Sequence, residues 1–202
     1  MQMIDAGNTT APWARALSFR VTLRDGRSAT VRPITATDKP RLVAALDAMS
    51  PRTRYLRFHS ARERFTDGEL RYLTELDYEN HVAWGAITEN EPGRPGIGAA
   101  RFIRDPDEPD TAEFSVVVVD AWQRTGLGSL LLRTLLVSAA ERGIRRLVGT
   151  VLRENTAALF MFAKFGGEPI GTDDDSLCVE IPVVSQYRTP RLSGQVVHRR
   201  AG

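Results

Sequence analysis

Hydrophobic and polar positions alternate along two short stretches in the first part of the chain. One stretch runs from Ser18 to Leu23 and the other from Ala29 to Ile34, with Asp25-Gly26 between them. Strict alternation is typical of strands with one buried face, and an Asp-Gly pair favours the tight turn of a hairpin. The pattern therefore predicts an antiparallel β-hairpin at the start of the folded region.

Three segments with helical spacing of apolar residues follow the hairpin. Thr37 or Asp38 can cap the first helix, whose apolar residues recur at intervals of three and four. Ser50-Pro51 begins the second helix. Thr66, with a glutamate three residues later, is typical of a capping box and begins the third. We therefore expect three short helices between the hairpin and the later strands.

The remaining chain alternates between strand-like and helix-like patterns. Strands are expected at residues 81–88, 97–103, 112–119, 145–152, 168–170 and 177–184, and helices at residues 129–142 and 155–165. An antiparallel meander thus precedes a strand–loop–helix–strand–helix–strand order. This order predicts an α+β (mixed α/β) fold rather than a helical bundle or a β-sandwich.

Length and composition favour one domain with tails. The chain has 202 residues, of which 42% are hydrophobic, and a net charge of +2. We expect a flexible leader over residues 1–16, a domain over 17–184 and a basic, disordered tail over 185–202. Cys178 is the only cysteine, which excludes an intramolecular disulfide and favours a cytoplasmic setting.

Several classes of function are disfavoured by what the sequence contains. No apolar stretch approaches the roughly 20 residues of a membrane span, and the small net charge argues against a general nucleic-acid binder. The three histidines are scattered, so neither they nor the single cysteine predict a metal site. We expect no membrane, nucleic-acid or metal partner.

The loop Gln123–Gly128 follows an apolar strand and begins a helix. Helix N-termini carry free N–H groups and a favourable dipole for anions, and glycines let a phosphate approach the backbone. The loop is therefore suited to a pyrophosphate, although an ordinary strand-to-helix turn would show the same residues. A P-loop and a dinucleotide fingerprint both fit badly, because neither glycine pattern is complete.

Two motifs that follow one another along the chain favour the pyrophosphate site over the ordinary turn. The loop reads Q-x-x-G-x-G, and the segment from Asn155 to Gly166 reads N-x-x-A-x-x-x-F-x-K-x-G. Together they resemble the GNAT superfamily of acyl-CoA-dependent N-acyltransferases. The resemblance implies a GNAT acyltransferase fold, in which a twisted, mostly antiparallel sheet flanked by helices bulges and splays at the acetyl-CoA site.

The resemblance also implies which residues bind acetyl-CoA. The backbone before the loop would pair with the pantetheine arm, the loop amides would bind the pyrophosphate, and Asn155 would lie near the thiol. The implied residues are Val116, Val117 and Val118 for the arm, Arg124, Thr125, Gly126, Leu127, Gly128 and Ser129 for the pyrophosphate, and Asn155.

One departure concerns proton transfer. Many members of the superfamily have a tyrosine general acid where this chain has Phe162, which we interpret as a packing residue. Glu113 enters the apolar strand, where desolvation would disfavour its carboxylate and make it a better proton acceptor near neutral pH. A solvated glutamate at the end of a strand is the alternative from position alone.

A subgroup of the superfamily resembles this chain more fully. The GNAT domains of Pat-type protein lysine acetyltransferases show a similar A-E-x-x-x-x-V strand, whose glutamate is their proposed base. They also show R-P-I-x-x-x-D and S-P-x-S/T-R-Y-x-R-F segments, which correspond to Arg32–Asp38 and Ser50–Phe58 here. The resemblance thus implies Glu113 as general base.

The implied activity is acetyl transfer from acetyl-CoA to a lysine side chain of a protein, such as a metabolic acyl-CoA synthetase. The enzyme would act as a monomer or homodimer. Two alternatives remain open. The acceptor could be a small amine, which an enclosed acidic pocket would favour over an open groove. The domain could also be a non-catalytic acyl-CoA sensor, which the missing tyrosine at Phe162 would favour.

Overall fold

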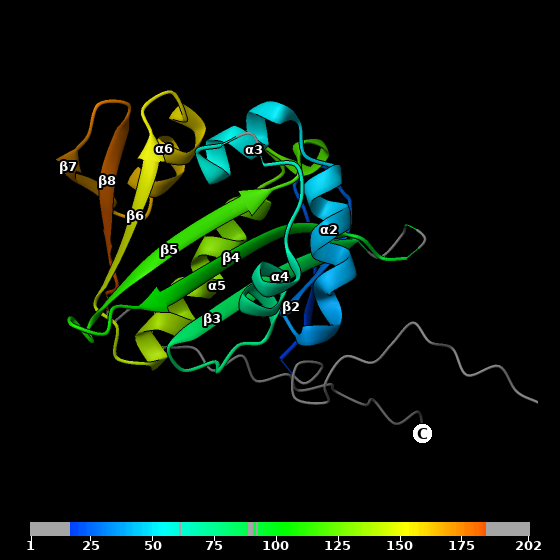
Figure 1. The fold of residues 1–202 in the computed structure, drawn as a ribbon, viewed down its shortest axis with the longest axis horizontal. Helices are drawn as coiled ribbons and strands as arrows, with labels where there is room; N and C mark the ends of the chain where they lie inside the picture. The colour runs from blue at the N-terminus through cyan, green and yellow to red at the C-terminus, as the bar shows by residue number, and fades with distance from the viewer. Residues whose placement is uncertain (1–16, 61, 89–90, 92, 185–202) are drawn as a thin grey trace, which may run out of the picture.

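The computed structural model describes residues 17–60, 62–88, 91 and 93–184. The predicted leader and tail lie outside these residues. The described residues form eight strands, five α-helices and two 3₁₀ turns (Figure 1). The strands are β1 (Phe19–Thr22), β2 (Ser28–Pro33), β3 (His81–Thr88), β4 (Gly96–Arg104), β5 (Thr111–Val118), β6 (Arg146–Leu152), β7 (Glu168–Thr172) and β8 (Ser176–Pro182). The helices are α2 (Lys39–Asp47), α3 (Pro51–Phe58), α4 (Asp67–Thr74), α5 (Leu127–Glu141) and α6 (Thr156–Ala163), with 3₁₀ turns η1 (Ala36–Asp38) and η2 (Asp120–Trp122).

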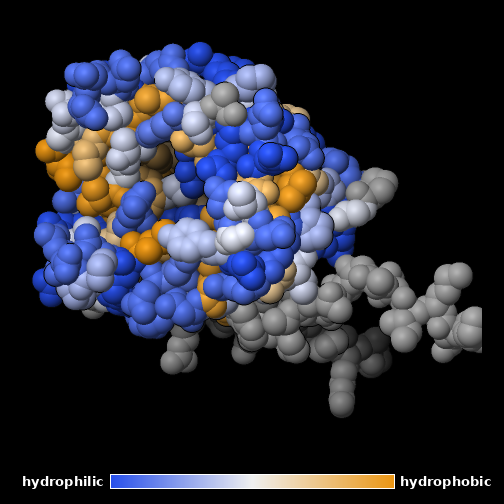
Figure 2. All heavy atoms as spheres, viewed as in Figure 1, coloured by the Kyte–Doolittle hydropathy of each residue, from blue (hydrophilic) through white to orange (hydrophobic). Residues whose placement is uncertain are grey.

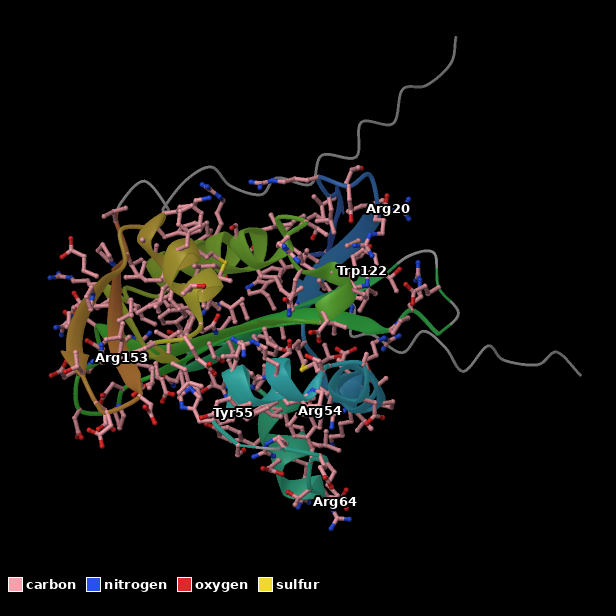
Figure 3. The ribbon with its side chains drawn as sticks, turned by 90° about the horizontal axis from the view of Figure 1, so that it is seen from above. Arg20, Arg54, Tyr55, Arg64, Trp122 and Arg153 are labelled. Atoms are coloured by element: carbon pink, nitrogen blue, oxygen red, sulfur yellow. The ribbon has the colours of Figure 1, made fainter. Side chains whose placement is uncertain are left out.

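All eight strands belong to one sheet in the order β1-β2-β3-β4-β5-β6-β8-β7. Every neighbouring pair is antiparallel except β5 and β6, which run parallel. Helices α2, α3 and α4 lie on one face of the sheet, and α5 and α6 lie on the other (Figure 3). The predicted α+β class and mostly antiparallel sheet are confirmed.

Helix α5 supplies much of the hydrophobic core. Its leucines at positions 131, 132, 135 and 136 are fully buried against the sheet. A helix that buries leucines over several turns gains roughly 1.5–3 kcal/mol from each one. This packing fixes the N-terminus of α5 against the end of β5, which is where the predicted cofactor loop lies.

One predicted helix start and one predicted capping interaction differ from the structure. Helix α5 begins at Leu127 rather than Ser129, because Gly126 takes the left-handed conformation (φ +92°) and caps the helix. Helix α2 begins at Lys39 with Asp38 at its N-cap position, which is one of the two predicted positions, but the Asp38 side chain forms no capping hydrogen bond. The Asp38 carboxylate instead accepts hydrogen bonds from Arg32 and from the Thr35 amide.

Strands β5 and β6 part after a short parallel ladder. The ladder runs from Thr111 opposite Arg146 to Glu113 opposite Val148, and β5 continues to Val118 without a partner on that side. The Phe114 ring packs so closely onto Gly149 that a Cβ atom there would lie 2.8 Å from the ring. The predicted splay is confirmed.

The strand that splays is regular. Strand β5 pairs with β4 without a register shift, from Gly98 opposite Val118 to Arg104 opposite Ala112. The bulge predicted in this strand is therefore wrong. The opening arises because β6 diverges from β5, where the Phe114 ring fills the space between the two strands.

Candidate active site

The opening between β5 and α6 is a cleft of about 490 Å³. Helix α3 borders it on one side, and the N-terminus of α5 lies at one end. In Figure 2 the surface is hollowed in this region, and hydrophobic residues gather around the hollow. Eight of the predicted cofactor residues line the cleft: Val116, Val117, Val118, Arg124, Gly126, Gly128, Ser129 and Asn155.

The other two predicted residues are placed differently. The side chains of Thr125 and Leu127 are buried, with exposed fractions of 5% and 0%. The Thr125 hydroxyl donates to the Trp122 carbonyl at 2.7 Å, and Leu127 packs in the core. Their side chains therefore shape the loop, and only their backbone could meet a ligand.

The glycines of the loop are required by its geometry. Gly126 has φ +92°, and a Cβ there would lie 3.3 Å from Nε of Arg24. A Cβ at Gly128 would lie 3.2 Å from Sδ of Met161. The first turn of a helix leaves several N–H groups without intrahelical partners. An anion could therefore approach the N–H groups of this backbone closely.

Positive side chains from distant parts of the chain contribute to the lining of the cleft. Arg24, Arg52, Arg124 and Lys164 all line the cleft. Arg24 comes from the turn of the β1–β2 hairpin, and its amide donates to the Thr125 carbonyl at 3.1 Å. Sequence analysis missed Arg24 and Arg52 as part of the site. Both residues are far from the cofactor loop in the sequence, and only the tertiary fold brings them to the cleft.

The unpaired edge of β5 offers alternate backbone groups to the cleft. The Val119 amide donates to the Ile97 carbonyl at 3.0 Å, on the β4 side. The backbone N–H and C=O groups of successive residues in a strand point alternately to its two sides. Val117 therefore pairs toward β4, as Val119 does, and the N–H groups of Val116 and Val118 face the cleft. The Val118 carbonyl accepts from the Gln123 side chain at 3.1 Å. Val118 therefore presents its N–H to a ligand.

The Ser50–Phe58 motif forms the N-terminus and body of α3. Ser50 and Thr53 both donate to the Asp120 carboxylate, with oxygen–oxygen distances of 2.7 and 2.8 Å. Partial burial raises the pKa of Asp120, but these hydrogen bonds outweigh it and hold the pKa below its usual value. The motif therefore anchors α3 to the loop that follows β5.

Helix α6 forms the other wall of the cleft. The Asn155 side chain caps this helix by accepting from the Ala158 amide at 3.2 Å. Phe162 is 7% exposed, and its ring meets the Phe114 ring edge-on with centroids 5.1 Å apart. The predictions of a capping Asn155 and a packing Phe162 are confirmed.

Glu113 occupies the last paired position before the strands part. Its side chain is exposed, and it is not among the residues that line the cleft. The predicted desolvation of Glu113 is therefore wrong, and the solvated alternative describes its surroundings. Along β5 it lies on the same face as Ser115 and Val117, toward α3, because side chains alternate along a strand.

Facing this side of β5, helix α3 carries a residue whose role the sequence did not reveal. Arg57 of α3 donates from Nη2 to the Ser115 hydroxyl at 2.8 Å. Burial lowers the pKa of Arg57, and the nearby charge of Glu113 partly opposes that effect. Arg57 belongs to the motif that resembles Pat-type domains, so the motif was the available signal.

The described residues contain no group of three or more His, Cys, Asp or Glu side chains arranged to hold a metal ion. No helix within residues 17–60, 62–88, 91 and 93–184 is long and apolar enough to cross a membrane.

The sequence model of the acetyltransferase (GNAT) family matches residues 50–167, more than half of the chain. The chain belongs to the GNAT family of acetyltransferases. The matched region begins with α3 and ends after α6, so it includes both walls of the cleft and the loop between them. The family predicted from the two motifs is confirmed.

Three similar proteins agree with this assignment. Acetyltransferase Pat of Mycolicibacterium smegmatis is 34% identical over 179 residues, which cover 87% of this chain and 53% of that protein. The chain therefore spans about half the length of that relative. The GNAT domain of S. lividans PAT is 30% identical, with a TM-score of 0.75 over 83% of this chain and 97% of that domain.

The third is yncA of Salmonella typhimurium, whose structure contains its cofactor acetyl-CoA. It is 18% identical, with a TM-score of 0.61 over 77% of this chain and 94% of that one. At this identity the likeness shows a shared fold. The GNAT fold predicted from the sequence is confirmed.

Proposed function

We propose that this protein transfers the acetyl group of acetyl-CoA to the ε-amine of a lysine on a protein. The observation that carries the proposal is the opening of β5 from β6 beside the N-terminus of α5. It provides a cleft with free backbone groups along one wall and an anion site at one end. Family membership and the motifs shared with Pat-type domains support the choice of donor and acceptor.

The cleft fits the parts of acetyl-CoA in sequence. The pyrophosphate would bind the backbone of Arg124–Ser129, with Arg24 and Arg124 supplying positive charge. The pantetheine amides would pair with Val116 and Val118, whose backbone groups face the cleft. Asn155 would lie beside the arm from the other wall. A site for an elongated anion with amide groups needs these features.

Acetyl-CoA supplies an acetyl group activated as a thioester. The N–H of Val118 would donate to the thioester carbonyl and stabilise the charge that develops on its oxygen. The Val117 amide pairs toward β4, so it is not available for this role. Glu113 would accept the proton of the lysine ammonium through a water molecule. Its exposure leaves room for that water and for a lysine on a protein surface. The free amine would attack the carbonyl carbon, the carbon–sulfur bond would break, and coenzyme A would leave as a thiolate that takes its proton from water.

The surroundings of Glu113 bear on the small-amine alternative. An enclosed acidic pocket would favour a small cationic acceptor. The second cavity of the described region has an apolar lining with arginines, and Glu113 itself is exposed. These features favour an acceptor on a protein surface, and an acyl-CoA synthetase remains our suggested partner. We place the reaction in the cytoplasm, where acetyl-CoA and reduced cysteines are found.

Thiol release from acetyl-CoA tests the proposal. The protein is mixed with acetyl-CoA and each of a panel of lysine-bearing proteins, including an acyl-CoA synthetase. We expect thiol release that depends on the acceptor, with acetyl-lysine found in the acceptor by mass spectrometry. Acetyl-CoA binding without transfer to any protein or small amine would contradict the proposal and favour the acyl-CoA sensor.

A further inference from the structure

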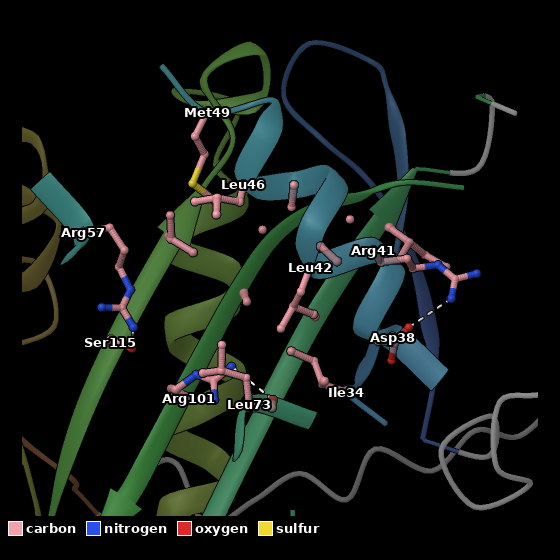
Figure 4. Close-up of a pocket in the computed structure, with 18 of the residues that line it drawn as sticks. Ile34, Asp38, Arg41, Leu42, Leu46, Met49, Arg57, Leu73, Arg101 and Ser115 are labelled. Carbon is pink, nitrogen blue, oxygen red and sulfur yellow. Dashed lines mark hydrogen bonds and ion pairs between the residues drawn. The ribbon is translucent and has the colours of Figure 1, made fainter. Parts of the chain in front are cut away.

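A second cavity of about 80 Å³ lies between the sheet and the helices α2, α3 and α4. Figure 4 shows it under α2, with Leu42, Leu46 and Met49 pointing inward. Most of the lining is apolar. This volume exceeds the roughly 10–15 Å³ that one water molecule needs, so the cavity has room for a small chemical group.

The cavity meets the acetyl-CoA cleft at two shared residues. Arg57 and Val117 line both spaces. Ser115 lies on the same face of β5 as Val117 and belongs to the cavity lining. A group in this cavity would therefore lie close to the proposed point of acyl transfer, next to the opened edge of β5.

Two arginines point into the end of the cavity that is nearer the cleft (Figure 4). Arg57 donates to the Ser115 hydroxyl, and Arg101 on β4 lies directly across the ladder from Ser115. Arg101 is only 8% exposed. Its Nη2 donates to the Leu73 carbonyl at 3.3 Å, and its Nη1 lies 3.2 Å from Nε2 of His81.

Neither arginine forms an ion pair with a carboxylate among the described residues. The other end of the cavity differs. There Asp38 lies between Arg32 and Arg41, at 2.8 Å from Nη1 of Arg32 and 3.0 Å from Nη1 of Arg41. The fold thus neutralises one pair of cavity arginines with a carboxylate in direct contact. The other pair has none within ion-pair distance, and only the charge of Glu113 acts on Arg57 from farther away.

Burying Arg57 and Arg101 without a carboxylate in ion-pair contact has an electrostatic cost. Burial lowers the pKa of Arg101 to about 10, and the charge of Arg57 adds to that effect. Burial, together with the charge of Arg101, also lowers the pKa of His81 to about 4, so His81 is neutral at pH 7. A buried charge is expensive unless an opposite charge meets it. A carboxylate from outside the chain would complete the arrangement.

We propose that Arg57 and Arg101 bind a carboxylate carried by one of the two substrates, beside the point of acyl transfer. The guanidinium groups present planar N–H donors that match a carboxylate. The location rests on the proposed acyl-transfer function. The carboxylate can come from an acyl chain that ends in an acid, as in succinyl-CoA. It can also come from the acceptor, as an acidic residue beside the target lysine.

Equilibrium binding, which needs no turnover, tests whether the acyl donor carries the carboxylate. Dissociation constants are measured for succinyl-CoA and butyryl-CoA, whose acyl chains have equal length and differ in the terminal carboxylate. If the donor carries the carboxylate, the protein binds succinyl-CoA at least tenfold more tightly, as expected for a charge-assisted hydrogen bond.

The acceptor source is tested by kcat/KM with acetyl-CoA and paired peptides. One peptide has glutamate beside the lysine, and its partner has glutamine. If the acceptor carries the carboxylate, the glutamate peptide reacts at least tenfold faster at low concentration. Equal values within both peptide and donor pairs would overturn the proposal, even if acetyl transfer itself proceeds.

Variants assign the preference to the two arginines. Arg101→Met should abolish the preference for the carboxylate partner and leave the neutral partner within about threefold. Arg57→Met should act in the same direction, and it provides the test if loss of the more buried Arg101 prevents folding. Arg71→Met is the matched control, because Arg71 is an exposed residue of the neighbouring α4 and lies outside the cavity.

The outcomes separate this proposal from the proposed function. A preference that survives both methionine variants, or one that Arg71→Met abolishes equally, would overturn the arginine subsite while acetyl transfer stands. Failure of acetyl transfer with every acceptor, together with tighter succinyl-CoA binding that Arg101→Met removes, would refute the lysine acetyltransferase and keep the carboxylate site.

Discussion

Gly126 is the residue where a single substitution should separate cofactor binding from folding. It caps α5 with φ +92°, and a Cβ there would lie 3.3 Å from Nε of Arg24. Gly126→Glu would place a negative charge at the proposed pyrophosphate site. An L-residue in this left-handed conformation costs roughly 1–2 kcal/mol. The variant should fold with a modest loss of stability.

The magnitude of the ligand effect follows from mass action. Acetyl-CoA at about 100 times its dissociation constant should stabilise the parent protein by about 2.7 kcal/mol. A domain of this size gains roughly 2–4 °C in Tm per kcal/mol, so the parent should shift by roughly 5–11 °C. Thermal unfolding with and without acetyl-CoA measures this shift, which Gly126→Glu should reduce to nearly zero.

Gly143→Glu is the matched control for backbone strain. Gly143 also has a positive φ of +75°, at the other end of α5, and no atom lies within 4 Å of a Cβ built there. The control should lose similar intrinsic stability and keep the full acetyl-CoA shift. A full shift in Gly126→Glu, or equal loss in both variants, would refute the assignment of this loop.

Three further substitutions, at two positions, test packing and electrostatics. Phe162→Ala should lower the free energy of unfolding, measured in urea, by about 3–5 kcal/mol. Phe162→Tyr should leave the rate of acetyl transfer within a few-fold of the parent. A large rate gain in the tyrosine variant would mean that the parent lacks a general acid. Asp38→Asn should cost about 3–5 kcal/mol at pH 7 because it leaves Arg32 buried without its partner. Burial raises the pKa of Asp38, but Arg32 lowers it further, to a folded-state value below normal. Its stabilisation is therefore complete above the unfolded pKa of about 3.9 and declines as pH falls through the folded value, so the parent and variant urea midpoints should converge in acid.

Local patterns predicted the fold well because most elements carry their own signals. The hairpin, the capping box at Thr66 and the start of α6 after Asn155 all appear where spacing and turn residues placed them. Helix α2 begins where predicted, with Asp38 at the N-cap position, but the Asp38 carboxylate binds Arg32 from a neighbouring strand instead of forming a capping hydrogen bond. Such competition between partners depends on the tertiary fold and leaves no periodic signal.

The site was predictable only where one segment carries it. The Gln123–Ser129 loop and Asn155 lie in continuous motifs, and both belong to the cleft. The exposure of Glu113 depends on which elements cover its face of the sheet, which an apolar strand pattern cannot reveal. Arg57 and Arg101 come together only because α3 crosses β5 opposite the ladder position of Arg101. That these two arginines lie close together could be found only from the structure.

The most direct test of the account is the turnover of Glu113→Gln with acetyl-CoA and a lysine-bearing acceptor protein. A positioned acid–base group typically contributes about 10²–10⁴-fold. We predict that kcat falls by that factor while the affinity for acetyl-CoA stays nearly unchanged, because Glu113 lies outside the cleft lining. Glu168→Gln, an exposed change on the edge strand β7, should leave both quantities unchanged. Near-normal turnover in folded Glu113→Gln would contradict the account and direct the search for a base to the loop of Asp105, Asp107, Glu108 and Asp110.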